Sequence, residues 1–79
     1  MLKVGKYCKN FRMIELEKTL REVGGEGNFK TLSSFEHGRS TNINHLWRYV
    51  KACNSYEQKL RFIVGLLNII VEGEENGWI

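Results

Sequence analysis

The sequence contains no proline and no aspartate. Without proline no helix is forced to break, so glycine must do most of the punctuation between helices. Without aspartate the carboxylates are all glutamates, and neither His37 nor His45 stands in a nucleophile-plus-base context. The glycine-rich segment GGEGNFKT lacks the GK[ST] of a phosphate-binding loop. We therefore expect neither catalysis nor a cofactor.

Cysteine and long apolar runs are also scarce. Cys8 and Cys53 form no CxxC pair, and no histidine lies at metal-ligand spacing from them. Both fall on apolar helical faces, which favours buried free thiols and no metal site. The N-terminus has no apolar segment typical of a secretory signal, and the longest apolar run, 62–71, is far too short to span a bilayer. We expect a cytoplasmic protein with no membrane partner.

The 79 residues suit one domain near the lower size limit for an unaided hydrophobic core. All twelve Lys and Arg lie in residues 1–61 with six acids, a surplus of six positive charges, whereas residues 62–79 carry three acids and no base. A basic body suits a polyanionic partner, because neutralising phosphates releases condensed counterions. An ordinary basic surface exposed to solvent is an equal alternative on charge alone.

Apolar periodicity predicts an all-α domain over 1–72 and a flexible acidic tail over 73–79. The five expected helices cover about 2–12, a short segment from Thr19, 28–37, 43–53 and 55–72. The status of 13–18 stays open. The expected inner face of the fourth helix is Ile43, Leu46, Trp47, Val50 and Cys53, and that of the fifth is Tyr56, Leu60, Ile63, Leu67, Ile70 and Val71, widened by Phe62, Leu66 and Ile69. The expected core joins Leu32, Phe35, Leu46, Trp47 and Val50 to Phe11 and Val23.

The segment 19–38 carries the strongest local signals. Thr19 followed three residues later by Glu22 is the capping-box pattern of a helix N-terminus. Asn28 is expected to cap the next helix, and Gly38 to end it. Glu36 is expected to pair with a base such as Arg12 and so to hold the fold rather than contact DNA.

A capped short helix, a tight turn and a second short helix with small polar outer residues together predict a helix-turn-helix. Its second helix must enter the major groove, so its outer side chains must be small and able to hydrogen-bond base edges. Lys30, Thr31 and Ser34 meet that requirement. Taken singly, each also fits an ordinary solvent-facing position.

The residues TLREV and TLSSFEHGRS resemble the phage-repressor-like helix-turn-helix family (Cro/repressor, XRE-type), and the resemblance covers about residues 2–54. It implies a five-helix lambda-repressor-like fold and a sequence-specific DNA-binding transcriptional regulator, a repressor or Cro-like protein from a phage or mobile element. Gly24 and Gly25 stand where the family has a small residue and more helix, and the motif is about two residues shorter. Either the first motif helix or the turn must therefore be abbreviated. Phe29, where the family can place a base-contacting polar residue, is expected to turn inward.

On this resemblance the partner is double-stranded DNA. The helix 28–37 is expected to read bases through Asn28, Lys30, Thr31 and Ser34. The DNA backbone is expected to meet Thr19, Arg39, Ser40, Thr41 and Asn42. A homodimer through helix 55–72 would space two recognition helices by about one DNA turn, ~34 Å. The alternative is a protein-binding helical module, such as an antirepressor or an inhibitor of a host regulator, that uses the same fold without DNA.

Overall fold

The computed structural model describes residues 2–75 of the chain. Its elements are α1 (Leu2–Asn10), a π-helix η1 (Phe11–Leu16), α2 (Leu20–Gly24), α3 (Phe29–Glu36), a 3-10 turn η2 (Ile43–His45), α4 (Leu46–Ala52) and α5 (Tyr56–Glu75). No strand occurs between residues 2 and 75, so the all-helical prediction is confirmed.

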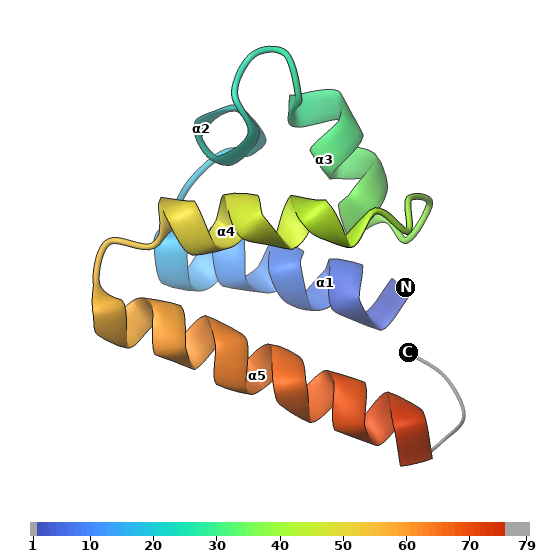
Figure 1. The fold of residues 1–79 in the computed structure, drawn as a ribbon. Helices are drawn as coiled ribbons and strands as arrows, with labels where there is room; N and C mark the ends of the chain where they lie inside the picture. The colour runs from blue at the N-terminus through green and yellow to red at the C-terminus, as the bar shows by residue number, and fades with distance from the viewer. Residues whose placement is uncertain (1, 76–79) are drawn as a thin grey trace.

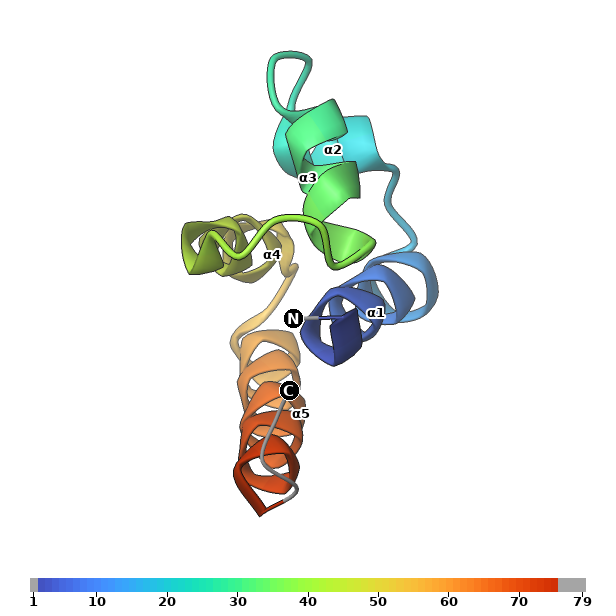
Figure 2. The same ribbon diagram turned by 90° about the vertical axis from the view of Figure 1, so that its right-hand side faces the viewer.

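Of the five α-helices, α1 and α4 lie in the middle of the molecule (Figure 1). The short α2 and α3 lie together at one end of the molecule, and α5 lies at the opposite end. A view turned by 90° shows the same separation, with α1 and α4 between the two ends (Figure 2). The α2–α3 pair is therefore well separated from α5.

The core is a single cluster of eight buried apolar side chains, drawn from every α-helix except α2: Val4, Cys8, Phe11, Leu16, Leu32, Phe35, Tyr49 and Phe62. The part of the core around Phe62 is aromatic. The Phe62 ring lies 4.9 Å from the Phe11 ring and 5.9 Å from the Tyr49 ring, measured between centroids. Contacts of this kind add to the stabilisation from buried area. They join α5 to α1 and α4.

The first helix does not end near residue 12. It continues through η1 to Leu16, which settles the open segment as helical as far as that residue. The wider π-helical turn buries Arg12 and Leu16 but leaves Met13 and Ile14 on the surface. Glu17 ends it in the left-handed region (φ 53°), a conformation that non-glycine residues adopt rarely.

The predicted inner face of α4 is confirmed for Leu46, Val50 and Cys53, which pack against the core, but is wrong for Ile43 and Trp47. Trp47 and Ile43 are each 61% exposed, whereas Tyr49 is fully buried. The spacing i, i+3, i+4, i+7 is met by 43, 46, 47 and 50 and equally by 46, 49, 50 and 53, so periodicity could not choose between two aromatic residues. Tyr49 takes the buried position because its hydroxyl donates a 2.7 Å hydrogen bond to Glu36 Oε2, a partner that the Trp47 indole lacks.

The predicted inner face of α5 is also wrong. Phe62 is its buried centre, with Leu66 and Ile69 packed beside it, and the six residues placed on the inner face are all exposed. The close approach of the Tyr7 hydroxyl to Gly65 fixes this rotation, because a Cβ at Gly65 would overlap that hydroxyl. Tyr7 also donates a 2.9 Å hydrogen bond to the Phe62 carbonyl.

The expected tail begins too early. Residues 73–75 still belong to α5, and residues 76–79 lie outside the described part of the chain. Both cysteines are free thiols, as expected; Cys8 is buried and Cys53 half-buried. Burial raises the pKa of the Cys8 thiol, which keeps it protonated near neutral pH.

Candidate nucleic-acid interface

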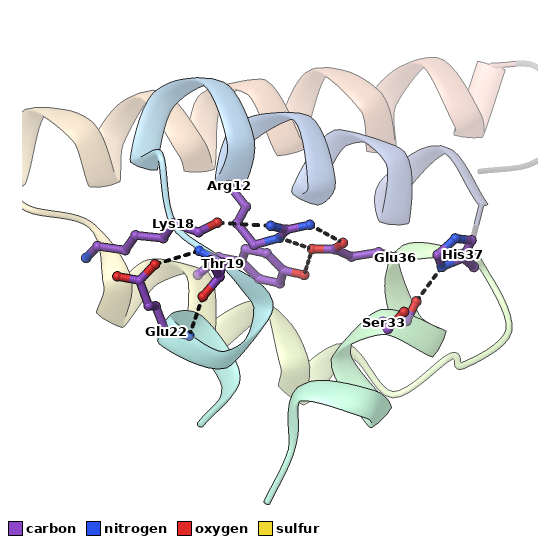
Figure 3. Close-up of polar contacts among 8 residues, drawn as sticks. Arg12, Lys18, Thr19, Glu22, Ser33, Glu36 and His37 are labelled. Carbon is purple, nitrogen blue, oxygen red and sulfur yellow. Dashed lines mark hydrogen bonds and ion pairs between the residues drawn. The ribbon is translucent and has the colours of Figure 1, made fainter. Parts of the chain in front are cut away.

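A complete capping box begins α2. The Thr19 hydroxyl accepts a hydrogen bond from the Glu22 amide (3.1 Å), and the Glu22 carboxylate accepts one from the Thr19 amide (2.9 Å). These bonds hold the pKa of Glu22 below its usual range. The prediction is confirmed, but the Thr19 hydroxyl and amide already have partners within α2 (Figure 3).

Helix α2 has only five residues. Gly25 ends it with φ +80° and its carbonyl accepts hydrogen bonds from the amides of Asn28 (3.2 Å) and Phe29 (3.1 Å), which makes the turn. A Cβ at Gly24 would lie 3.2 Å from the Leu32 side chain, so this glycine lets the two motif helices approach. Asn28 occupies the N-cap position of α3, as predicted, but its side chain makes no capping hydrogen bond.

Packing on α1 fixes the position of α3. Leu32 and Phe35 are fully buried. A Cβ added to Gly5 of α1 would lie 2.5 Å from the Phe35 carbonyl oxygen and 2.6 Å from that of Glu36. Any residue larger than glycine at position 5 would therefore force α1 and α3 apart.

A buried ion pair locks the C-terminal end of α3 to the first helix (Figure 3). The Arg12 guanidinium donates from Nε to Glu36 Oε2 (2.8 Å) and from Nη2 to Oε1 (3.0 Å), a two-pronged geometry that confirms the predicted pairing. Arg12 Nη1 donates to the Lys18 carbonyl (2.9 Å), and Tyr49 donates to Glu36. Four elements, η1, the 17–19 linker, α3 and α4, thus meet in one polar network.

The network raises the pKa of two of its members, Arg12 and Tyr49. The hydrogen bond to Glu36 raises the pKa of Arg12. Burial, and then the hydrogen bond to Glu36, raise the pKa of Tyr49. Arg12 stays charged and Tyr49 neutral, so the Glu36 carboxylate keeps an ion partner and a hydroxyl donor across the physiological range.

The end of α3 is a Schellman motif that directs the chain into the 39–42 loop. The Gly38 amide bonds to the Phe35 carbonyl (3.0 Å) and the Arg39 amide to the Ser34 carbonyl (2.9 Å). Gly38 has φ +76°, and a Cβ there would lie 2.9 Å from Leu2 Cα. The predicted stop at Gly38 is confirmed.

The outer face of α3 exposes Lys30 and Thr31, with Ser34 half-buried one turn beyond Lys30. Asn28 is half-buried at the start of the helix. Phe29 is half-buried as well, but outside the core cluster, and the Arg21 guanidinium lies 4.3 Å from its ring centroid. This cation–π contact covers the Phe29 ring from the side of α2.

Thr19, which was expected at the DNA backbone, is the N-cap of α2, and the other four residues expected there lie in the loop after α3. Arg39 and Thr41 are exposed. Ser40 Oγ accepts from the Asn42 amide (3.3 Å), and Asn42 Oδ1 accepts from the Asn44 amide (3.1 Å), which begins η2. Ser40 and Asn42 therefore shape the loop, and Arg39 is its only charged side chain.

A polar pocket of about 270 Å³ beside the motif includes residues that the sequence did not single out. Asn42 lies at this pocket together with the exposed Trp47 and the cations Arg48 and Lys51. The buried His45 also lines it, with no hydrogen-bond partner for Nε2. Burial, and then the charge of Arg48, lower the pKa of His45. The spacing of Trp47, Arg48 and Lys51 on one helix could have indicated this cationic surface.

A second hollow lies between α1–η1 and α5, away from the motif. It has a volume of about 640 Å³ and is lined by Tyr7, Asn10, Phe11, Ile14, Glu15, Glu57, Leu60, Arg61, Val64, Gly65 and Asn68. Arg61 lies across it, 3.5 Å from Glu15 and 3.6 Å from Glu57. This groove is apolar in the middle and charged at one end.

Comparison of the chain with known protein families, with curated proteins and with solved structures finds no match. Within residues 2–75, no three His, Cys, Asp or Glu side chains come together as metal ligands. None of the described helices has the length and apolar character needed to cross a membrane.

Proposed function

We propose that the protein is a sequence-specific DNA-binding regulator whose α3 enters the major groove. The observation that carries the proposal is the outer face of α3. This helix is held by its Leu32–Phe35 face and by the Glu36 network, and it exposes Lys30 and Thr31, with Ser34 half-buried beside them. It lies with α2 at one end of the molecule (Figure 2). Small donors and acceptors beside a cation are what base-edge recognition needs.

The family resemblance of TLSSFEHGRS agrees with this arrangement and makes a repressor or Cro-like role the specific form of the proposal. DNA binding requires a recognition helix in a fixed position and does not require a reactive centre. We therefore propose no catalysis. The two negative charges nearest the turn are compatible with binding, because Glu22 is held within α2 and Glu26 lies 3.5 Å from Arg21. Arg39, Arg48 and Lys51 supply positive charge for the phosphates.

Replacing Lys30 or Ser34 with alanine is expected to weaken binding to the cognate site by about 1–3 kcal/mol and to spare non-specific binding, because each loses a base-edge contact. Sites selected from random DNA supply the cognate sequence, and titration of cognate and scrambled duplexes measures the ratio. Lys6→Ala is the matched control, since it removes the same charge from an exposed position on α1. An unchanged cognate-to-scrambled ratio in both α3 variants would show that α3 does not read the groove.

Arg39→Ala is expected to weaken all duplexes alike and to flatten the salt dependence by about one unit, because its exposed guanidinium lies in the loop after α3 and meets phosphate rather than bases. Titrations at several salt concentrations measure the slope. A loss confined to the cognate duplex would assign Arg39 to base reading instead.

The alternative function is a protein-binding module. The observation that favours it is the exposed apolar face of α5, described below. A mobility shift that disappears with rising salt supports DNA binding. No shift on any duplex, together with a partner bound through α5, supports the alternative.

A further inference from the structure

The outer side of α5 carries a continuous apolar face. Six of its residues are between 37% and 54% exposed: Leu60, Ile63, Val64, Leu67, Ile70 and Val71. At about 100° per residue they cover an arc of roughly 120° on the side of the helix away from Phe62. Contiguous apolar surface of this kind on a small domain usually marks an interface.

This face points away from the candidate DNA surface. Phe62 directs the inner side of α5 toward α1 and α4, beyond which lie α2 and α3 (Figures 1 and 2). Most of the apolar arc is therefore turned to the opposite end of the molecule, and its Leu60 and Val64 edge borders the groove beside α1 and η1. A partner on α5 would leave the outer face of α3 open.

The distribution of charge along α5 identifies the partner. Its first six residues contain Glu57, Lys59 and Arg61, a net charge of +1, whereas the charged residues of its last turn, at 72, 74 and 75, are all acids. Two copies of α5 packed antiparallel place the basic part of each beside the acidic part of the other, whereas parallel packing opposes like charges. We propose that the α5 face binds α5 of a second copy of this chain in antiparallel orientation.

The register follows from the same residues. With the two-fold axis near Leu67, Ile63 faces Ile70 of the second copy, and the start of each α5 lies beside the end of the other. A two-fold interface must be self-complementary, and the arc meets this condition because its apolar residues extend to both sides of Leu67. Leu60 and Val71 then close the two ends.

The dimer has a consequence that rests on the proposed DNA binding. Because the α5 faces point away from α3, the two α3 helices lie at opposite ends of the dimer. They would engage two separate DNA segments, in place of two half-sites one turn apart on one duplex. The spacing of ~34 Å expected from sequence is therefore not what this face provides.

Disulfide trapping tests the dimer and its orientation without DNA. Leu67→Cys places two thiols near the two-fold axis and is expected to give an oxidised dimer at tens of micromolar. Leu60→Cys is the matched variant. Seven residues from the axis is about 10 Å along each helix, so its two thiols lie roughly 20 Å apart, beyond the reach of a disulfide. The parent chain controls for Cys8 and Cys53.

Sedimentation provides the independent measurement. The parent is expected to sediment as a dimer and Leu67→Lys as a folded monomer. Ile43→Lys, which puts the same charge on an exposed apolar residue of η2, should remain dimeric. Trapping through both Leu60→Cys and Leu67→Cys would show parallel packing, and a monomeric parent would overturn the dimer itself. Retained DNA binding by Leu67→Lys separates either failure from a failure of the proposed function.

Discussion

Replacing Glu36 with alanine is expected to lower the free energy of unfolding by about 3–5 kcal/mol, because Arg12 is left as a buried charge without its partner. The Arg12 and Glu36 side chains are 9% and 1% exposed, so water can replace little of the lost interaction. Tyr49 loses its acceptor in the same variant. Since a domain of this size has only a small margin of stability, the variant is expected to be largely unfolded at 37 °C.

Urea denaturation followed by circular dichroism measures the change, with Glu57→Ala as the control. Glu57 also forms an ion pair with an arginine, at 3.6 Å, but its side chain is 81% exposed, and exposed pairs add little to stability. Combining Glu36→Ala with Arg12→Met should recover part of the loss, because the orphaned charge is removed. A Glu36→Ala variant as stable as the Glu57→Ala control would mean that the network does not hold α3.

Two aromatic residues of α4 are expected to differ sharply when each is cut to alanine. Tyr49→Ala should cost about 3–5 kcal/mol, because it empties a fully buried site against Phe62. Trp47→Ala should cost less than about 1 kcal/mol, because the indole is largely exposed. This order is the reverse of the one that the sequence periodicity suggests.

Thermal melting of both variants compares them directly. Tyr49→Phe divides the effect of Tyr49 further: it keeps the ring but removes the hydrogen bond to Glu36, and is expected to cost about 1–3 kcal/mol because a buried acceptor loses a donor. A Trp47→Ala variant that melts as low as Tyr49→Ala would place the indole in the core and contradict the phase of α4.

Features that depend only on neighbouring residues could be predicted before the fold was known. The capping box at Thr19 and Glu22 and the glycine stop at Gly38 are set by local backbone chemistry, so they could be predicted within a few residues. The all-helical class follows from the periodicity and the absence of proline. The candidate site could be predicted to the same degree. Lys30, Thr31 and Ser34 lie on a different face of the helix from Leu32 and Phe35, because only residues three or four positions apart share one face.

Which face of α4 and which face of α5 is buried depends on contacts between helices. Tyr49 and Trp47 satisfy the same spacing, and the choice depends on Glu36, which arrives from another helix. Residues around α5 are apolar on most sides, so its rotation depends on the contact between Tyr7 and Gly65 and on the aromatic cluster at Phe62. Periodicity indicates that a helix has an apolar side. Residues distant in the sequence determine which side becomes buried, and on α5 they leave the widest apolar side exposed.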